Sequence, residues 1–172
     1  MTDDITSAGK WGPQMRGNEV PFCVALTIAA ESVSLFRYLE LGPGNLETLR
    51  AVVTYLGSDN GPTEWEAHGV DQANYPLGRD RHGMTIHTCG CEEFLAGRHG
   101  FWNYVFISEL ADRARALREF QLIEPWVELG GVVCVRVPEL LDGTRPGWRT
   151  LCETKPPDAE SGALWIQKVS NG

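Results

Sequence analysis

The sequence predicts a single α+β domain, built from small mixed or antiparallel sheets with helices between them. Short runs of aromatic and β-branched residues, such as 104–107 (YVFI) and 132–137 (VVCVRV), are typical of buried strands. Residues 108–118 instead repeat apolar side chains at helical spacing, with arginines between them. A chain of 172 residues is also the usual size of one domain.

The N-terminal part of the chain contains few regular patterns. Residues 1–19 are polar, with Gly and Pro but little periodicity, which predicts a flexible arm ahead of a globular domain at 20–172. Residues 21–28 (PFCVALTI) are apolar and favour a strand, whereas 35–41 (LFRYLEL) fit either a strand or a helix.

A break and a helix follow these two segments. Gly42-Pro43-Gly44 interrupts any regular element, and Asn45 is a suitable N-cap for a helix that includes Leu46, Leu49, Val52 and Val53. Residues 57–83 are rich in Gly, Pro, Asn and Asp, which predicts one long loop. Loops of this length are uncommon in compact domains and are often functional.

The C-terminal half carries most of the expected strands. Residues 84–88 (MTIHT) favour a strand, and 92–95 a short helical turn. After the segment at 104–118, the run at 132–137 gives the strongest strand pattern. Residues 149–153 are expected to pair back, and 163–169 (ALWIQKV) to form the last strand.

Charge and cysteine content restrict the class of protein. The net charge of −8 argues against broad binding to nucleic-acid backbones and favours a small-molecule or basic protein acceptor. No apolar run is long enough to cross a membrane, and the acidic N-terminus lacks a signal core. Five scattered cysteines fit reduced thiols, so we expect a cytoplasmic protein with no membrane partner.

One cluster has the chemistry of a metal site. His87, Cys89 and Cys91 alternate, so a continuous strand would place all three on one face. Imidazole and thiolate suit zinc or copper, and His82, His99 or His68 would have to supply a fourth ligand. The alternative is that the cysteines are buried or incidental thiols.

Several common catalytic and nucleotide-binding motifs are missing from the sequence. There is no GxSxG nucleophile motif. The segments GPGN (42–45) and GPTEW (61–65) are interpreted as turns, and neither is a phosphate-binding P-loop. No GxGxxG follows a predicted strand, which disfavours a dinucleotide fold of the Rossmann type.

The order of elements resembles that of the ADP-ribosyltransferase-like fold. The segments that carry the resemblance are LFRYLEL, NLETLRAVVTYLGSDN, YVFISELADRARALREF, GGVVCVRVPELLDGTRPGWRTLCET and ALWIQKV, within residues 35–169. They are similar in pattern to rifamycin-type ADP-ribosyltransferases and RNA 2′-phosphotransferases. The resemblance implies a split sheet with an NAD-binding cleft, and NAD-dependent ADP-ribosyl transfer or NAD cleavage.

The resemblance also implies roles for particular side chains. Arg37 would hold a phosphate or ribose of NAD, Tyr55 or Tyr104 would stack on the nicotinamide, and Ser58 would steady the catalytic acid. Glu153 would bind the ribose 2′-hydroxyl and stabilise the oxocarbenium ion, and Glu128 competes for that place. The family's Ser-Thr-Ser run is absent, and no Glu-x-Glu or Gln-x-Glu pair precedes a predicted strand.

Two other functions fit the sequence. A non-catalytic binding or inhibitor protein would use an aromatic-rich surface, for instance Trp65 with Trp102. A metal-dependent enzyme would use the cluster at His87. The transferase hypothesis requires Arg37, one of the aromatic residues and one of the glutamates to meet in a single cleft.

Overall fold

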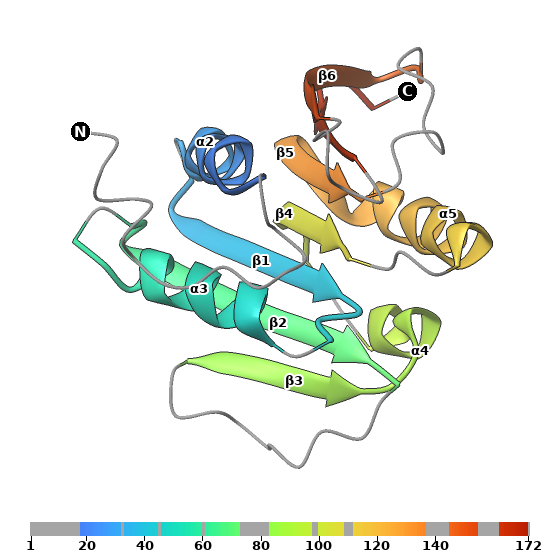
Figure 1. The fold of residues 1–172 in the computed structure, drawn as a ribbon, viewed down its shortest axis with the longest axis horizontal. Coiled ribbons are helices and arrows are strands. Elements are labelled where there is room, and N and C mark those ends of the chain that lie inside the picture. Colours follow the sequence, from blue (N-terminus) through green and yellow to red (C-terminus); the bar gives the residue numbers. More distant parts are fainter. Residues whose placement is uncertain are drawn as a thin grey trace.

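The computed structural model shows one seven-stranded sheet with helices on both faces (Figure 1). It describes residues 18–31, 33–44, 46–59, 61–72, 83–97, 100–108, 112–136, 145–154 and 162–171. The strands are β1 (Leu35–Leu41), β2 (Glu64–Asp71), β3 (Met84–Thr88), β4 (Trp102–Ile107), β5 (Val127–Val135), β6 (Trp148–Thr154) and β7 (Ala163–Lys168). The helices are α2 (Glu19–Ala30), α3 (Glu47–Leu56), α4 (Cys91–Ala96), α5 (Arg113–Ile123) and the 3-10 helix η2 (Glu124–Trp126).

The strand order in the sheet is β3-β2-β1-β4-β5-β7-β6. Strands β1 to β5 are parallel to one another, and β7 is antiparallel to both β5 and β6. The chain builds outward from β1 to β3 and then returns to the other side of β1 with β4. The carboxyl ends of β1 and β4 therefore meet where the order reverses, which is the usual position of a ligand site in such sheets.

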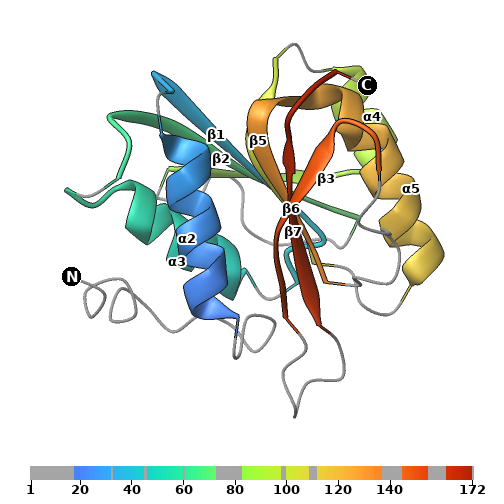
Figure 2. The same cartoon turned by 90° about the horizontal axis from the view of Figure 1, so that it is seen from above.

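The helices form two layers, with α2 and α3 on one face of the sheet and α4 and α5 on the other (Figure 2). The central strand β1 serves both layers because alternate side chains of a strand point to opposite faces. Tyr38 belongs to the core under α2 and α3, and Leu39 to the core under α4 and α5. Both are fully buried. A parallel strand buried on both faces has a continuously apolar sequence, as LFRYLEL nearly has.

One buried hydrogen bond crosses the core under α2 and α3. The indole Nε1 of Trp165 on β7 donates to the hydroxyl of Tyr104 on β4, at 3.0 Å. Both side chains are fully buried. The ring of Phe22 from α2 packs 5.1 Å from the Tyr104 ring. The bond thus satisfies two polar groups that have no access to water, and it links the parallel and antiparallel parts of the sheet.

The prediction of a fold that mixes helices and strands is confirmed, but the split sheet is wrong. Residues 21–28, expected as a strand, lie in α2. This segment is apolar on nearly every side, and short apolar runs do not distinguish a strand from a buried helix. The strands are also not concentrated in the C-terminal half, since β1, β2 and β3 all precede residue 89.

The predicted loop at 57–83 contains the buried strand β2. Its sequence, EWEAHGVD, includes a glycine and three acidic residues, which lower its apparent strand propensity. Packing explains the glycine at position 69, because a Cβ there would lie 3.0 Å from the side chains of both Ile86 and Leu49. The glycine therefore allows β2 to lie between β3 and α3.

Several other predicted elements are confirmed. Residues 84–88 form β3, and 149–153 lie in β6. The expectation that 149–153 pair back on the preceding strand is wrong, because β7 lies between β5 and β6 and pairs with both. The helix after β4 begins at Arg113, where the side chain of Asp112 caps it by accepting from the backbone N–H of Arg115 at 2.9 Å. The proposed N-cap Asn45 lies outside the described residues, as does the arm at 1–19 except for its last two residues.

No helix in the described part of the chain is long and apolar enough to cross a membrane.

We expect Tyr104→Phe to destabilise the protein by about 1–3 kcal/mol, because the indole N–H of Trp165 would be left buried without an acceptor. The matched control is Tyr55→Phe, whose hydroxyl contacts the exposed Thr27 at 3.1 Å. That change should cost less than about 1 kcal/mol, since Thr27 can bond to water instead. Urea unfolding of the two variants measures the difference. Equal losses would contradict the importance of the Trp165 bond.

Candidate functional site

A glycine turn lies at the carboxyl end of β1, beside the reversal in strand order. Gly42 and Gly44 have φ angles of 70° and 55°, in the left-handed region that glycine adopts without strain. The N–H of Gly42 donates to the carbonyl of Val70 on β2 at 2.9 Å. Leu46, also left-handed with φ 65°, closes the turn by donating to the carbonyl of Pro43. The turn leads directly into α3.

Ser108 joins the end of β4 to this turn. Its backbone N–H donates to the carbonyl of Leu41 at 3.1 Å, and its hydroxyl contacts the carbonyl oxygens of Leu41 and Gly42. The side chain is buried. The hydroxyl thus holds the two central strands together at the point where the chain opens into the turn.

Glu40, two residues before the first glycine of the turn, is a fully buried carboxylic acid. The hydroxyl of Tyr38 donates to its Oε2 at 3.0 Å. Its Oε1 has no hydrogen-bond partner anywhere in the described structure. Burial raises the pKa of Glu40 to about 8, against a smaller lowering by the Tyr38 hydrogen bond. At neutral pH the group is therefore mostly protonated, and one of its oxygens lacks a partner.

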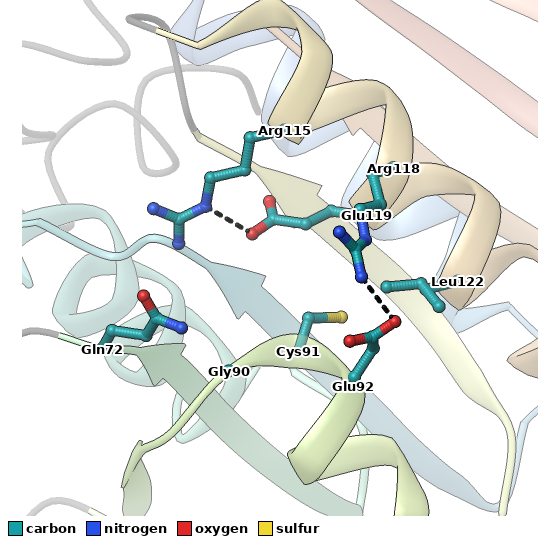
Figure 3. A pocket seen from close by; sticks show the side chains of 8 residues that line it. All are labelled: Gln72, Gly90, Cys91, Glu92, Arg115, Arg118, Glu119 and Leu122. Atoms are coloured by element: carbon teal, nitrogen blue, oxygen red, sulfur yellow. Dashed lines mark hydrogen bonds and ion pairs between the residues drawn. The ribbon is translucent and has the colours of Figure 1, made fainter.

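A cavity of about 260 Å³ lies at the same edge of the sheet, between the start of α4 and α5 (Figure 3). It begins next to Asp71, the last residue of β2, since Gln72 is one of its walls. Two ion pairs border it, Arg115 with Glu119 at 3.0 Å and Arg118 with Glu92 at 2.8 Å. The lining residues are Gln72, Gly90, Cys91, Glu92, Arg115, Arg118, Glu119 and Leu122.

The residues predicted for an NAD cleft do not converge. Arg37 lies toward the amino ends of the strands, where its Nε bonds to Glu66 at 3.1 Å. Glu128 is also at that end and accepts from Asn103 at 2.6 Å. Glu153 lies instead toward the carboxyl end of the outermost strand β6. These positions are at opposite ends of the sheet.

The predicted aromatic and serine positions have structural contacts. Tyr104 is buried under α2 and bonds to Trp165, and Tyr55 on α3 contacts Thr27. The hydroxyl of Ser58 donates to the carbonyl of Tyr55 at 2.7 Å, closing the end of α3. None of the three faces the glycine turn or the cavity lining.

The predicted metal cluster is not formed by the described residues, among which no three His, Cys, Asp or Glu side chains gather as ligands. His87 stacks instead on His68, with ring centroids 5.3 Å apart and a contact of 3.0 Å between Nε2 and Nδ1. Burial raises the pKa of Cys91 to about 12, so this thiol is protonated and a poor ligand. His82 and His99 lie outside the described residues.

The proposed aromatic binding surface is also incomplete. Trp102 is buried, 4% exposed, and packs against Phe94 and His68. Trp65 is half-buried, so it is the only residue of the pair with part of its side chain exposed. The two side chains therefore do not form an exposed patch that could anchor a partner.

Comparison with known proteins identifies the fold. No protein-family model and no curated protein matches the sequence. Among solved structures, an rRNA methylase from Streptococcus thermophilus is similar, with a TM-score of 0.60 at 13% identity, covering 87% of this chain and 97% of that one. An S-adenosyl-L-methionine methyl transferase from Silicibacter pomeroyi gives a TM-score of 0.59 at 17% identity, covering 90% and 94%.

A third similar structure contains a ligand. The MycE methyltransferase of the mycinamycin biosynthetic pathway, in complex with Mg and SAH, gives a TM-score of 0.61 at 14% identity. The match covers 90% of this chain and 49% of MycE. These likenesses show that the chain has a Rossmann-like methyltransferase fold.

The resemblance to ADP-ribosyltransferases is therefore wrong, and with it the expectation of NAD as substrate. The segments that suggested it are real helices and strands, but they pair in one doubly wound sheet. The exclusion of a Rossmann-type fold was also wrong. The full GxGxxG motif is not required, because two left-handed glycines after β1 suffice to turn the chain.

We expect the stability of the wild-type protein to fall relative to Glu40→Gln as the pH rises from about 5 to 8. Glu40 binds its proton in the folded state up to a pKa of about 8, but the unfolded chain releases it near 4.5. Release of this proton by the unfolded chain therefore lowers the free energy of unfolding, by at most about 5 kcal/mol across this range. Urea unfolding at pH 5, 6, 7 and 8 measures it. The control is Glu93→Gln, at an exposed position, whose stability difference from wild type should not change with pH. A pH-independent difference for Glu40→Gln would contradict the conclusion that Glu40 is a buried, protonated acid.

Proposed function

We propose that the protein is a methyltransferase that uses S-adenosylmethionine as its methyl donor, bound at the carboxyl ends of β1, β2 and β4. The observation that carries the proposal is the buried Glu40, whose Oε1 lacks a partner among the described residues, beside the glycine turn at the reversal in strand order. The fold shared with methyltransferases supports it.

The residues at this edge fit the chemical groups of the donor. The donor carries an ammonium group and a sulfonium, so a carboxyl group with one unsatisfied oxygen suits it, as Glu40 provides. Gly42 and Gly44 allow the backbone to approach a ligand closely. Asp71 ends the neighbouring strand β2, where a carboxylate suits ribose hydroxyls. The cavity beside Gln72 gives room for the adenine ring.

The protein contributes to the reaction by binding and orienting the methyl donor and the acceptor. The bound donor supplies an electrophilic methyl group on a positively charged sulfur. Ser108 and the glycine turn form a rigid floor, because their mutual hydrogen bonds fix the ends of β1 and β4. Holding donor and acceptor in line lowers the barrier mainly by removing their relative freedom of motion.

We infer that the acceptor is a small molecule or a basic protein. The net charge of −8 disfavours binding to long nucleic-acid backbones.

Binding of S-adenosylhomocysteine tests the donor site directly. We expect Asp71→Asn to weaken binding by about tenfold or more, because a charge-assisted hydrogen bond to the ribose would be lost. Asp59→Asn is the matched control, since Asp59 is an exposed carboxylate beyond the end of α3. Isothermal titration calorimetry measures both variants. A wild-type protein that does not bind S-adenosylhomocysteine would overturn the proposed function.

Proton release tests the role of Glu40. An ammonium group beside Glu40 would favour its carboxylate form, so binding at pH 7 should release up to about one proton per site. Titrations of S-adenosylhomocysteine in two buffers of different ionisation enthalpy measure the number released. The release should disappear in Glu40→Gln and when 5′-methylthioadenosine, which has no ammonium group, replaces the ligand. Equal proton release by wild type and Glu40→Gln would assign the proton to another group.

A further inference from the structure

Arg136 lies at the same edge of the sheet as the glycine turn, directly after β5. Its backbone N–H donates to the carbonyl of Ile107, the last residue of β4, at 3.4 Å. Its guanidinium lies close enough to Cys134 for the two to interact electrostatically. Cys134 belongs to the core under α2 and α3, which is the face that also holds Glu40. Arg136 and Glu40 thus share one face and one end of the sheet.

Within the described residues, the Nε of the Arg136 guanidinium has no hydrogen-bond partner. This atom is buried, and no ion pair involves the side chain within the described parts of the chain. Arg115, Arg118 and Arg145 differ, because each of them contacts a glutamate. In a chain with 23 acidic residues against 15 basic ones, a partner could easily have been provided.

The two titratable groups described on this face, Cys134 and Glu40, do not neutralise the charge of Arg136. Burial raises the pKa of the Cys134 thiol well above its usual range, so the thiol is uncharged. Glu40, with its pKa raised to about 8, is mostly uncharged at neutral pH. Burial also lowers the pKa of Arg136, which reflects the cost of keeping a guanidinium half-buried. A cation without a partner at this depth destabilises the fold, and an anionic ligand would offset that cost.

We propose that Arg136 binds an anionic group, a carboxylate or a phosphate, of the molecules that occupy the methyl-transfer site. This inference rests on the proposed function. The planar fork of arginine matches the paired oxygens of such a group. Two sources are possible, the α-carboxylate of the donor or an acidic group of the acceptor.

The position of Arg136 in the sheet indicates which group of each ligand would reach it. Glu40 pairs in register with Phe106, and Phe106 with Cys134, so Glu40 and Cys134 lie two strands apart, about 10 Å. Arg136 lies beyond Cys134 on the side away from Asp71. A donor that places its ribose at Asp71 and its ammonium at Glu40 would therefore reach Arg136 only with its carboxylate. An acceptor above β4 and β5 would reach it with an acidic substituent.

Ligand titrations distinguish the two sources. If Arg136 holds the donor carboxylate, Arg136→Gln should weaken S-adenosylhomocysteine binding at least tenfold and change 5′-methylthioadenosine binding less than twofold. If it holds an acceptor group, neither affinity should change in Arg136→Gln. Arg113→Gln is the matched control, because Arg113 is exposed at the start of α5.

A second readout uses the wild-type protein and needs no variant to fold. In protein labelled with ¹⁵N at arginine, inorganic phosphate should shift the Nε–H resonance of Arg136 in a saturable way, and the Arg136→Gln spectrum identifies that resonance. For an acceptor site the shift should persist when S-adenosylhomocysteine saturates the protein. For a donor-carboxylate site S-adenosylhomocysteine should abolish it.

The experiments distinguish failure of the anion site at Arg136 from failure of the proposed donor site. If the wild type binds S-adenosylhomocysteine but phosphate leaves the Arg136 resonance unmoved, and Arg136→Gln binds both nucleosides normally, the anion site is overturned and the donor site stands. If phosphate shifts the resonance but S-adenosylhomocysteine does not bind, the donor site is overturned and Arg136 remains an anion site.

Discussion

The parallel pairing of β1 with both β2 and β4 is the constraint on which the rest of the structure depends. Because β2 lies on one side of β1 and β4 on the other, the carboxyl ends of these three strands lie side by side at one edge of the sheet. The turn after β1 must be tight, and two left-handed glycines, Gly42 and Gly44, make it so. The helices then cover the faces and leave this end of the sheet as the natural position for a ligand.

Two ionisable side chains near the glycine turn each have one buried polar atom without a partner among the described residues. Glu40 and Arg136 sit on one face of the sheet near its carboxyl edge, and each retains a hydrogen-bonding atom that no described residue satisfies. Buried polar groups are normally satisfied, and these two atoms are among five buried side-chain atoms without a hydrogen-bond partner in the described structure. Their position at the strand reversal supports the proposed binding of a ligand with both positive and negative charge. A zwitterionic methionine-type group, or a cationic donor beside an acidic acceptor, has that character.

The amino end of the sheet is different, because its charged groups are paired. Arg37 bonds to Glu66, Glu128 to Asn103, and Arg145 to Glu124. Such contacts hold strands and turns in place. This is why Arg37 and Glu128, chosen as site residues from sequence order, belong to the structural end of the sheet.

The sequence by itself determined the local features: most of the strands and helices, a mixed domain, and a glycine break after residues 35–41. Glu40, Gly42 and Gly44 were recognisable as an acidic residue and a Gly-x-Gly turn, although Asp71 was hidden in a segment interpreted as loop. Only the tertiary structure decided the strand order, which placed Asp71 and Ser108 beside that turn and Arg37 at the other end. Pairing between distant strands depends on burial and register across the whole sheet, and no local pattern of residues encodes that.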